Sequence, residues 1–129
     1  MMTQPIYLPL RAMGKPTMTA ADRWKKRPCI LRYREYCDRV RGGIPNAPDP
    51  DGIRQVIVRA HFAMPKSWSV KKQREMCGQP HRTKPDWDNI SKALMDALWP
   101  GCDEKIPGGD VLKFWSTEDL IEVRFRFEE

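Results

Sequence analysis

Two aspartates one residue apart, followed by a lysine, are the residues of this chain best suited to chemistry. They are Asp86, Asp88 and Lys92. Pro85 favours an extended conformation at Lys84, and if the extension continues to residue 88 the two carboxylates lie on one side. Carboxylate oxygens are hard ligands that suit Mg²⁺ or Mn²⁺, and Lys92 lies one helical turn beyond Asp88. This combination indicates metal-assisted phosphodiester chemistry.

The same two aspartates also have a simpler interpretation. Asp88 is placed to cap the N-terminus of the helix that follows, and Asp86 would then be a solvated acid in a turn. Helix caps are common, so the simpler interpretation is favoured by about three to one for an isolated Asp-x-Asp motif. The surrounding sequence has to decide between them.

Length and composition predict one small domain over residues 1–129 with one modest core. No apolar run is long enough to cross a bilayer, and the first residues lack the features of a signal peptide. We therefore expect a cytoplasmic protein without a membrane partner. The four cysteines show neither a Cys-x-x-Cys pair nor zinc-like spacing, which argues against a disulfide framework.

Positive charge is concentrated in two runs that flank an acidic centre. The formal net charge is +6, and the first run covers residues 11–41. The second run, together with one lysine further along, supplies the predicted DNA-binding residues: Lys66, Lys71, Lys72, Arg74, Arg82, Lys84 and Lys113. Cations attract the phosphate backbone while acids hold a metal ion. Either run taken alone is equally consistent with ordinary solvated surface.

The hydrophobic pattern predicts an α+β domain, a mixed β-sheet with helices packed on one face. Strands are expected at residues 6–10, 55–64, 111–115 and 120–127, the first of them at a sheet edge because Pro9 cannot donate to a ladder. Helices are expected at 28–41, 69–77 and 89–98, the last with Asp88 as its cap.

The segment K-P-D-W-D-N-I-S-K-A-L-M-D-A-L, residues 84–98, resembles the signature of RusA-family Holliday-junction resolvases, which are commonly phage-encoded endonucleases. Segments on both sides extend the resemblance. They are Met64-Pro-Lys-Ser-Trp-Ser69, Lys71-Lys72-x-Arg74 and Gly78-x-Pro80-His81 upstream, and Asp103-x-x-Ile106 and Lys113-Phe-Trp-Ser116 downstream. A fifteen-residue match is far more specific than a lone Asp-x-Asp, and it reverses the preference for the capping interpretation.

The resemblance implies the role of each site residue. Asp86 and Asp88 become metal ligands, and Lys92 becomes the lysine that neutralises phosphate charge. Asp103 and Asp110 both lie where the family has a third metal-binding acid, and either choice is open from the residues alone. Counting from Asp103 keeps the downstream segments in register, so we choose Asp103 as the third catalytic acid, although Cys102 replaces the acid that usually precedes it.

The sequence also suggests roles for three residues near the Asp-x-Asp motif. Trp87 is expected to pack in the core, with stacking on an exposed DNA base as the alternative. Asp96, four residues beyond Lys92, is expected to orient that lysine through a salt bridge. His81 lies in a basic loop from which it could contact phosphate.

The resemblance implies a Mg²⁺-dependent endodeoxyribonuclease, with Mn²⁺ as an alternative ion, that resolves four-way junctions by paired nicking in recombination and repair. A two-fold homodimer would deliver two active sites to the two strands. Two other functions stay open at this point: a nuclease that prefers flaps, forks or duplex DNA, and a non-catalytic DNA-binding phage regulator. The sequence gives neither a preferred cleavage sequence nor the dimer surface.

Overall fold

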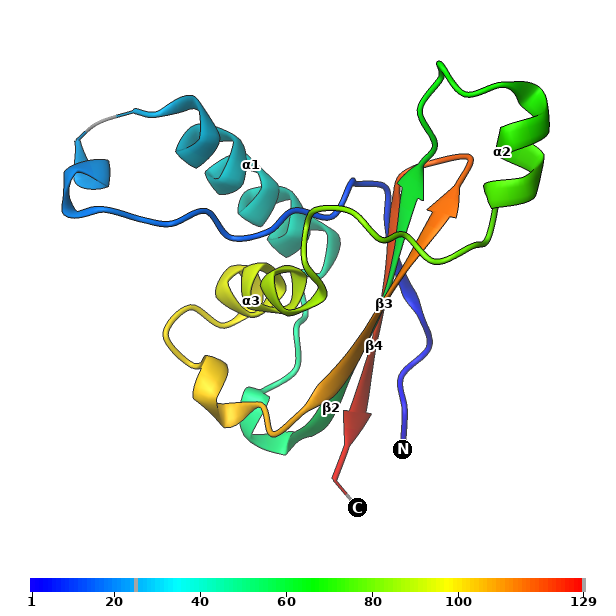
Figure 1. Ribbon diagram of the computed structural model, residues 1–129. Helices are drawn as coiled ribbons and strands as arrows, with labels where there is room; N and C mark the ends of the chain where they lie inside the picture. The colour runs from blue at the N-terminus through cyan, green and yellow to red at the C-terminus, as the bar shows by residue number, and fades with distance from the viewer. Residues whose placement is uncertain (25, 129) are drawn as a thin grey trace.

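The computed structural model of the protein describes residues 1–24 and 26–128. Its elements follow the order of the expected ones, and Figure 1 shows how they are arranged. The strands are β1 Ile6–Leu8, β2 Ile53–Ala63, β3 Gly109–Ser116 and β4 Leu120–Phe127. The α-helices are α1 Pro28–Gly43, α2 Val70–Met76 and α3 Trp87–Leu98. Three 3₁₀ turns, Ala20–Arg23, Pro50–Gly52 and Asp103–Lys105, occur in the connections.

The four strands form one mixed sheet in the order β1-β4-β2-β3. β2 pairs with β4 antiparallel and with β3 parallel, and β1 pairs with β4 antiparallel at one edge. The mixed sheet, and the edge position of the first strand, are therefore confirmed. β1 ends at Leu8, two residues earlier than expected, because Pro9 has no N–H to extend the ladder.

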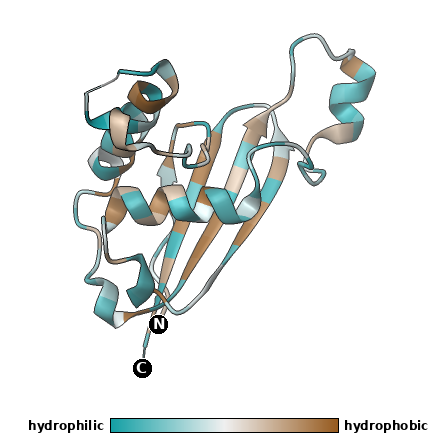
Figure 2. Cartoon of the chain, turned by 60° about the vertical axis from the view of Figure 1, so that its left-hand side comes forward, coloured by the Kyte–Doolittle hydropathy of each residue, from teal (hydrophilic) through white to brown (hydrophobic). Residues whose placement is uncertain are grey.

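The core lies between one face of the sheet and helices α1 and α3, which cover that face only (Figure 1). Alternate residues of β2 and β4 are buried in it, and the brown bands along the strands of Figure 2 mark apolar residues. Its largest fully buried side chains are Leu8, Ile30, Tyr33, Val40, Ile53, Val58, Phe62, Ile90, Leu94, Ile121, Val123 and Phe125. The sequence expectation of helices on one face is confirmed for α1 and α3, whereas α2 lies on an arm beyond the end of the sheet (Figure 1).

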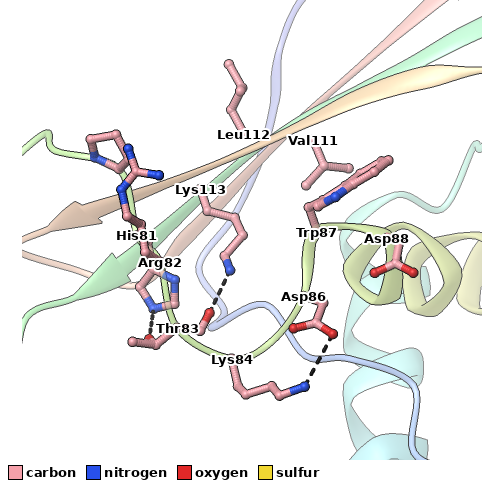
Figure 3. A pocket seen from close by; sticks show the side chains of 11 residues that line it. His81, Arg82, Thr83, Lys84, Asp86, Trp87, Asp88, Val111, Leu112 and Lys113 are labelled. Carbon is pink, nitrogen blue, oxygen red and sulfur yellow. Dashed lines mark hydrogen bonds and ion pairs between the residues drawn. The ribbon is translucent and has the colours of Figure 1, made fainter.

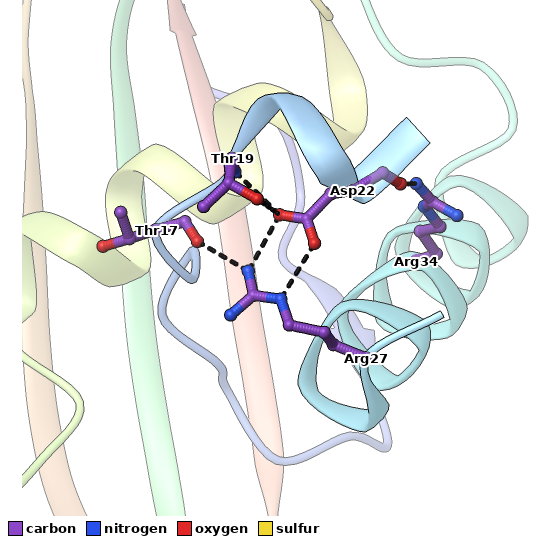
Figure 4. Close-up of polar contacts among 5 residues, drawn as sticks. All are labelled: Thr17, Thr19, Asp22, Arg27 and Arg34. Carbon is purple, nitrogen blue, oxygen red and sulfur yellow. Dashed lines mark hydrogen bonds and ion pairs between the residues drawn. The ribbon is translucent and has the colours of Figure 1, made fainter. Parts of the chain in front are cut away.

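A polar cluster fixes the chain where it enters α1 (Figure 4). The buried carboxylate of Asp22 accepts two hydrogen bonds of 2.8 Å from the guanidinium of Arg27 and one of 2.7 Å from the backbone N–H of Thr19. Arg34 donates to the backbone oxygen of Asp22 at 2.9 Å. The hydrogen bonds from Arg27 are the main reason that the pKa of Asp22 lies well below its usual value of 3.8.

The hydroxyl of Tyr33 on α1 donates a 2.7 Å hydrogen bond to Asp96 on α3. Asp96 also pairs with the ammonium of Lys15 at 3.3 Å. A second contact also holds the N-terminal segment: the side-chain amide of Asn89 donates a hydrogen bond to the carbonyl oxygen of Lys15 at 3.2 Å. Gly14 fits there because a Cβ atom would overlap the amide of Asn89. Residues 11–17 are thus fastened along the start of α3.

Candidate active site

The Asp-x-Asp motif lies at the N-terminus of α3, but its local structure differs from the prediction. Asp86 is the N-cap residue, with extended backbone at φ −70° and ψ 148°, and its carbonyl oxygen accepts from the N–H of Ile90 at 3.0 Å. The helix therefore begins at Trp87, and Asp88 lies in its first turn. The predictions that the extension continues through Asp88 and that Asp88 caps the helix are wrong. The expected start at residue 89 came from the apolar stripe of this helix. Trp87 and Asp88 are exposed and do not belong to that stripe, so the stripe did not reveal the first turn.

Both carboxylates nevertheless line one depression of about 940 Å³ (Figure 3). Its remaining walls come from the segment before α3 and from β3. They are Pro80, His81, Arg82, Thr83, Lys84, Trp87, Val111, Leu112 and Lys113. Three of the seven predicted DNA-binding cations, Arg82, Lys84 and Lys113, thus face the same space as the two acids. The ammonium of Lys84 pairs with the carboxylate of Asp86 at 3.3 Å.

Backbone pairing along the outer edge of β3 places the basic wall of this depression. The N–H of Gly78 donates to the carbonyl of Trp115 at 2.8 Å, Trp115 donates to Gln79 at 2.9 Å, and His81 donates to Lys113 at 3.0 Å. Residues 78–81 therefore run along the edge of the sheet. This pairing fixes the course of the chain directly before the Asp-x-Asp motif.

Lys113 joins β3 to the loop before α3. Its ammonium donates a 2.6 Å hydrogen bond to the carbonyl oxygen of Thr83 (Figure 3). Partial burial lowers the pKa of Lys113, while the nearby carboxylate of Asp86 acts in the opposite direction. Lys113 therefore supplies a positive charge beside Asp86. Nothing in the sequence pointed to the carbonyl of Thr83 as its partner.

His81 is buried, with 4% of its surface exposed. Its ring stacks on Phe62 at 4.0 Å between centroids and contacts Trp115 at 4.4 Å. Nε2 lies 3.1 Å from the hydroxyl of Thr83. Burial, and secondarily the charges of Lys113 and Arg11, lower the pKa of His81 to about 4. His81 is thus a neutral support of the loop, and its predicted contact with phosphate is wrong for a side chain enclosed in this way.

A second, smaller depression of about 340 Å³ adjoins the first. Lys92 and Asp103 line it, and Trp87 and Val111 line both depressions. Asp110 lines neither of them and follows Gly109, where a Cβ atom would overlap the carbonyl oxygen of Val56. Asp103 is therefore on the same surface as Lys92.

The structure does not gather three acids around one point. Within residues 1–24 and 26–128, no group of three or more His, Cys, Asp or Glu side chains is close enough to hold a metal ion. The pair Asp86 and Asp88 still fits Mg²⁺, because this ion keeps several waters and is commonly held by one or two carboxylates together with substrate phosphates.

Two further predictions near the motif are wrong. Trp87 is 61% exposed and does not pack in the core. Asp96 does not orient Lys92: among the described residues no salt bridge joins the two, and Asp96 is bound instead by Tyr33 and Lys15. The Lys92–Asp96 pair was predicted from their four-residue spacing on α3. That spacing carries no information about partners on α1 or in the N-terminal segment.

The remaining predicted DNA-binding cations lie on the arm between β2 and α3. Lys66, Lys71, Lys72 and Arg74 are all exposed there. The ammonium of Lys72 lies 4.3 Å from the ring centroid of Trp68, and a shallow depression of about 350 Å³ includes both of them together with Arg82. The arm thus continues the basic surface away from the two acids.

A small α+β domain with paired acids at a helix N-terminus, facing a basic wall, suits a class of protein that acts on phosphodiester bonds. Comparison with family models identifies it: the model described as Endodeoxyribonuclease RusA matches residues 11–125. The chain belongs to this family of Holliday-junction resolvases, which makes it a nuclease with a DNA substrate. Nucleases of the family are generally metal-dependent. Comparison with curated proteins gave no match.

Proposed function

We propose that this protein resolves Holliday junctions by Mg²⁺-dependent paired nicking, with Mn²⁺ as an alternative ion. The observation that carries the proposal is the depression in which Asp86 and Asp88 face Arg82, Lys84 and Lys113. Acids alone would repel a DNA strand, and cations alone would bind it without holding an ion. Both kinds of charge along one depression suit cleavage of a phosphate backbone.

Asp86 and Asp88 would hold the divalent ion, with Asp103 as the proposed third acid. When bound, the ion would polarise the scissile phosphate and lower the pKa of a coordinated water. Lys113 and Lys92 would place positive charge beside the phosphate from the two adjoining depressions. Arg82 and Lys84 would hold the backbone of the strand in position. The exposed ring of Trp87, between the depressions, would stack on a base next to the break.

The proposal also covers further DNA contacts and the oligomeric state of the protein. The cations on the arm, Lys66, Lys71, Lys72 and Arg74, would contact phosphates of a neighbouring duplex arm of the junction. A two-fold homodimer would present two such sites to the two symmetry-related strands.

A DNA substrate in recombination and repair implies action in the cytoplasm of a bacterial cell. No helix among the described residues is long and apolar enough to span a membrane.

The substrate preference is tested by comparing a mobile four-way junction with the separate linear duplexes of its arms, each with and without Mg²⁺. We expect paired nicks in the junction at symmetry-related positions, dependent on the ion, and at least about tenfold slower cutting of the linear arms. Flap and fork substrates are included in the same assay. Faster cutting of either one than of the junction would reassign the enzyme to that branched structure.

A further inference from the structure

Arg11, the first residue of the first basic run, lies beside the candidate active site. It follows β1 and belongs to the N-terminal segment, which passes close to Lys84 and Asp86 (Figure 3). A depression of about 360 Å³ lies between this segment and the start of α3, and we call it the N-terminal depression. Its lining consists of residues 11–14 together with Lys84, Pro85, Asp86 and Asn89.

The N-terminal depression is the last of three that adjoin one another in series. The depression that contains Lys92 shares Trp87 and Val111 with the depression of about 940 Å³. That larger depression shares Lys84 and Asp86 with the N-terminal depression. The depression of Lys92 and the N-terminal depression have no lining residue in common. A strand of DNA that passes through all three therefore crosses the paired acids between its two outer contacts.

Two contacts hold the guanidinium of Arg11 in place. Its Nη1 donates to Oδ1 of Asp119, in the turn between β3 and β4, at 3.1 Å, and the same oxygen accepts from the N–H of Ala63 at 2.8 Å. Its Cζ lies 5.1 Å from the ring centroid of Phe62. Among residues 1–24 and 26–128, Asp119 is its only hydrogen-bonding partner. The side chain is 49% exposed, so its other N–H groups are free to bind an acceptor from outside the chain.

The charges around the N-terminal depression favour an anion. Arg11 and Lys84 are its two cations, and Asp86 is its one acid. Asp86 is already paired with the ammonium of Lys84 at 3.3 Å, whereas Arg11 has no acid within the depression as a partner. A guanidinium with free N–H groups matches the oxygens of a phosphate. The phosphates of a DNA strand are the anions that the substrate supplies.

We propose that Arg11 binds the backbone phosphate next to the one that is cut. The phosphate that is cut would lie in the depression with Lys113, and its neighbour would lie in the N-terminal depression on the other side of Asp86. Asp119 is then a positioning residue, because its carboxylate holds the guanidinium of Arg11 while the remaining N–H groups face the strand. This inference rests on the proposed function, since the cut phosphate defines which neighbour Arg11 contacts. The contact carries no sequence preference, because every nucleotide has the same phosphate.

The first test measures how junction affinity depends on salt, by gel-shift titration in EDTA between about 50 and 200 mM NaCl. Each phosphate contact contributes about −0.9 to the slope of log K against log salt concentration. Arg11→Gln should therefore have a slope smaller by about 0.9 than wild type. Arg11→Lys keeps the charge and should keep the wild-type slope. Arg32→Gln, an exposed cation of α1 that lines none of the three depressions, is the matched control and should also keep it.

The second test locates the contact on the strand. Single backbone phosphates of the junction are replaced, one at a time, by uncharged methylphosphonates. Replacement of the phosphate next to the nick should weaken binding by wild type at least about fivefold and by Arg11→Gln less than about twofold, because the contact is already lost in the variant. Equal losses in both proteins, or an unchanged salt slope in Arg11→Gln, would overturn the proposal.

Neither measurement needs cleavage, so this inference and the proposed function fail in different ways. A wild-type chain that nicks the junction, together with a wild-type salt slope in Arg11→Gln, would defeat the inference alone. A wild-type chain that never nicks would defeat the proposed function, and the salt slopes would still decide whether Arg11 binds phosphate.

Discussion

Trp87 and Val111 together line both depressions that contain the predicted site residues, the one with Asp86 and Asp88 and the one with Lys92 and Asp103. Trp87 comes from the first turn of α3 and Val111 from β3. A strand of DNA that contacts both depressions must therefore pass this pair. The indole of Trp87 is the side chain best placed to meet a base at that point.

Trp87→Ala should weaken junction binding without destabilising the fold. The indole is 61% exposed, so its removal exposes little core. Stacking of a base on an aromatic side chain contributes about 1–3 kcal/mol, which corresponds to an affinity loss of about fivefold to 150-fold. Gel-shift titration in EDTA measures the affinity, and thermal unfolding measures stability. Trp87→Phe is the control and should retain most of the affinity. A lower Tm with unchanged affinity would mean that Trp87 has only a structural role.

Asp103→Asn should reduce junction cutting by at least about 100-fold, while Asp110→Asn should stay within about threefold of wild type. Asp103 shares a depression with Lys92, and Asp110 lines neither depression. Loss of a carboxylate that helps to hold a catalytic ion is expected to lower the rate to this extent. Single-turnover nicking of a junction at saturating Mg²⁺ compares the two variants directly. The reverse ranking would assign the third acid to Asp110.

His81→Phe should make stability less dependent on pH. The pKa of His81 is lowered to about 4, so between pH 6.5 and pH 4 the unfolded chain binds more protons at this position than the folded chain. Wild-type stability therefore falls as pH decreases through that window, by about 2 kcal/mol from this group between pH 7 and pH 5. A phenylalanine ring in its place keeps the aromatic contacts and has no proton to bind.

Urea unfolding midpoints at pH 7 and pH 5 test this prediction. The wild-type midpoint should fall more than that of His81→Phe over this range. Replacement of the exposed Arg82 by Gln serves as a control for the segment and should leave the wild-type pH dependence unchanged. Equal pH dependence in wild type and His81→Phe would mean that His81 titrates in the folded protein as it does when unfolded.

Asp22→Asn should lower the Tm by several degrees at pH 7, and the difference from wild type should shrink in acid. Hydrogen bonds from Arg27 hold the pKa of Asp22 below 3.8. The stabilisation is therefore complete above the pKa of the unfolded chain and is lost as pH falls through the lower folded value. Thermal unfolding from pH 7 to pH 2.5 measures the difference. A constant difference across that range would show that the carboxylate charge is not what stabilises the cluster.

The sequence was a good guide to elements with a strong local pattern. The alternation in β4 gave its bounds, and the apolar stripe of α3 gave its buried face, because both signals arise from the side chains that make the core. The start of α3 was missed by two residues since its exposed first turn carries no such signal. Asp96 binds Tyr33 and Lys15 and not Lys92. These contacts join distant segments of the chain, and spacing within one helix cannot reveal them.

The candidate active site, like the fold, was predictable in part. A shared position for Asp86 and Asp88 followed from the motif, even though the expected backbone conformation was wrong, because an N-cap residue and a residue in the first helical turn can both face the same depression. The supporting contacts of Thr83 and His81 were not predictable. They depend on residues 78–81 pairing with the outer edge of β3, and that segment has no strand pattern.

The central claim is that Asp86 and Asp88 hold a divalent ion that cleaves DNA. It is tested most directly by nicking of a four-way junction with wild type and Asp88→Asn in Mg²⁺, alongside junction binding by both in EDTA. We predict that wild type nicks, and that Asp88→Asn loses at least about 1,000-fold in rate while binding the junction equally well or more tightly, since one negative charge near phosphate is gone. Wild type that binds the junction but does not cut it with Mg²⁺ or Mn²⁺, or a variant that cuts normally, would contradict this account.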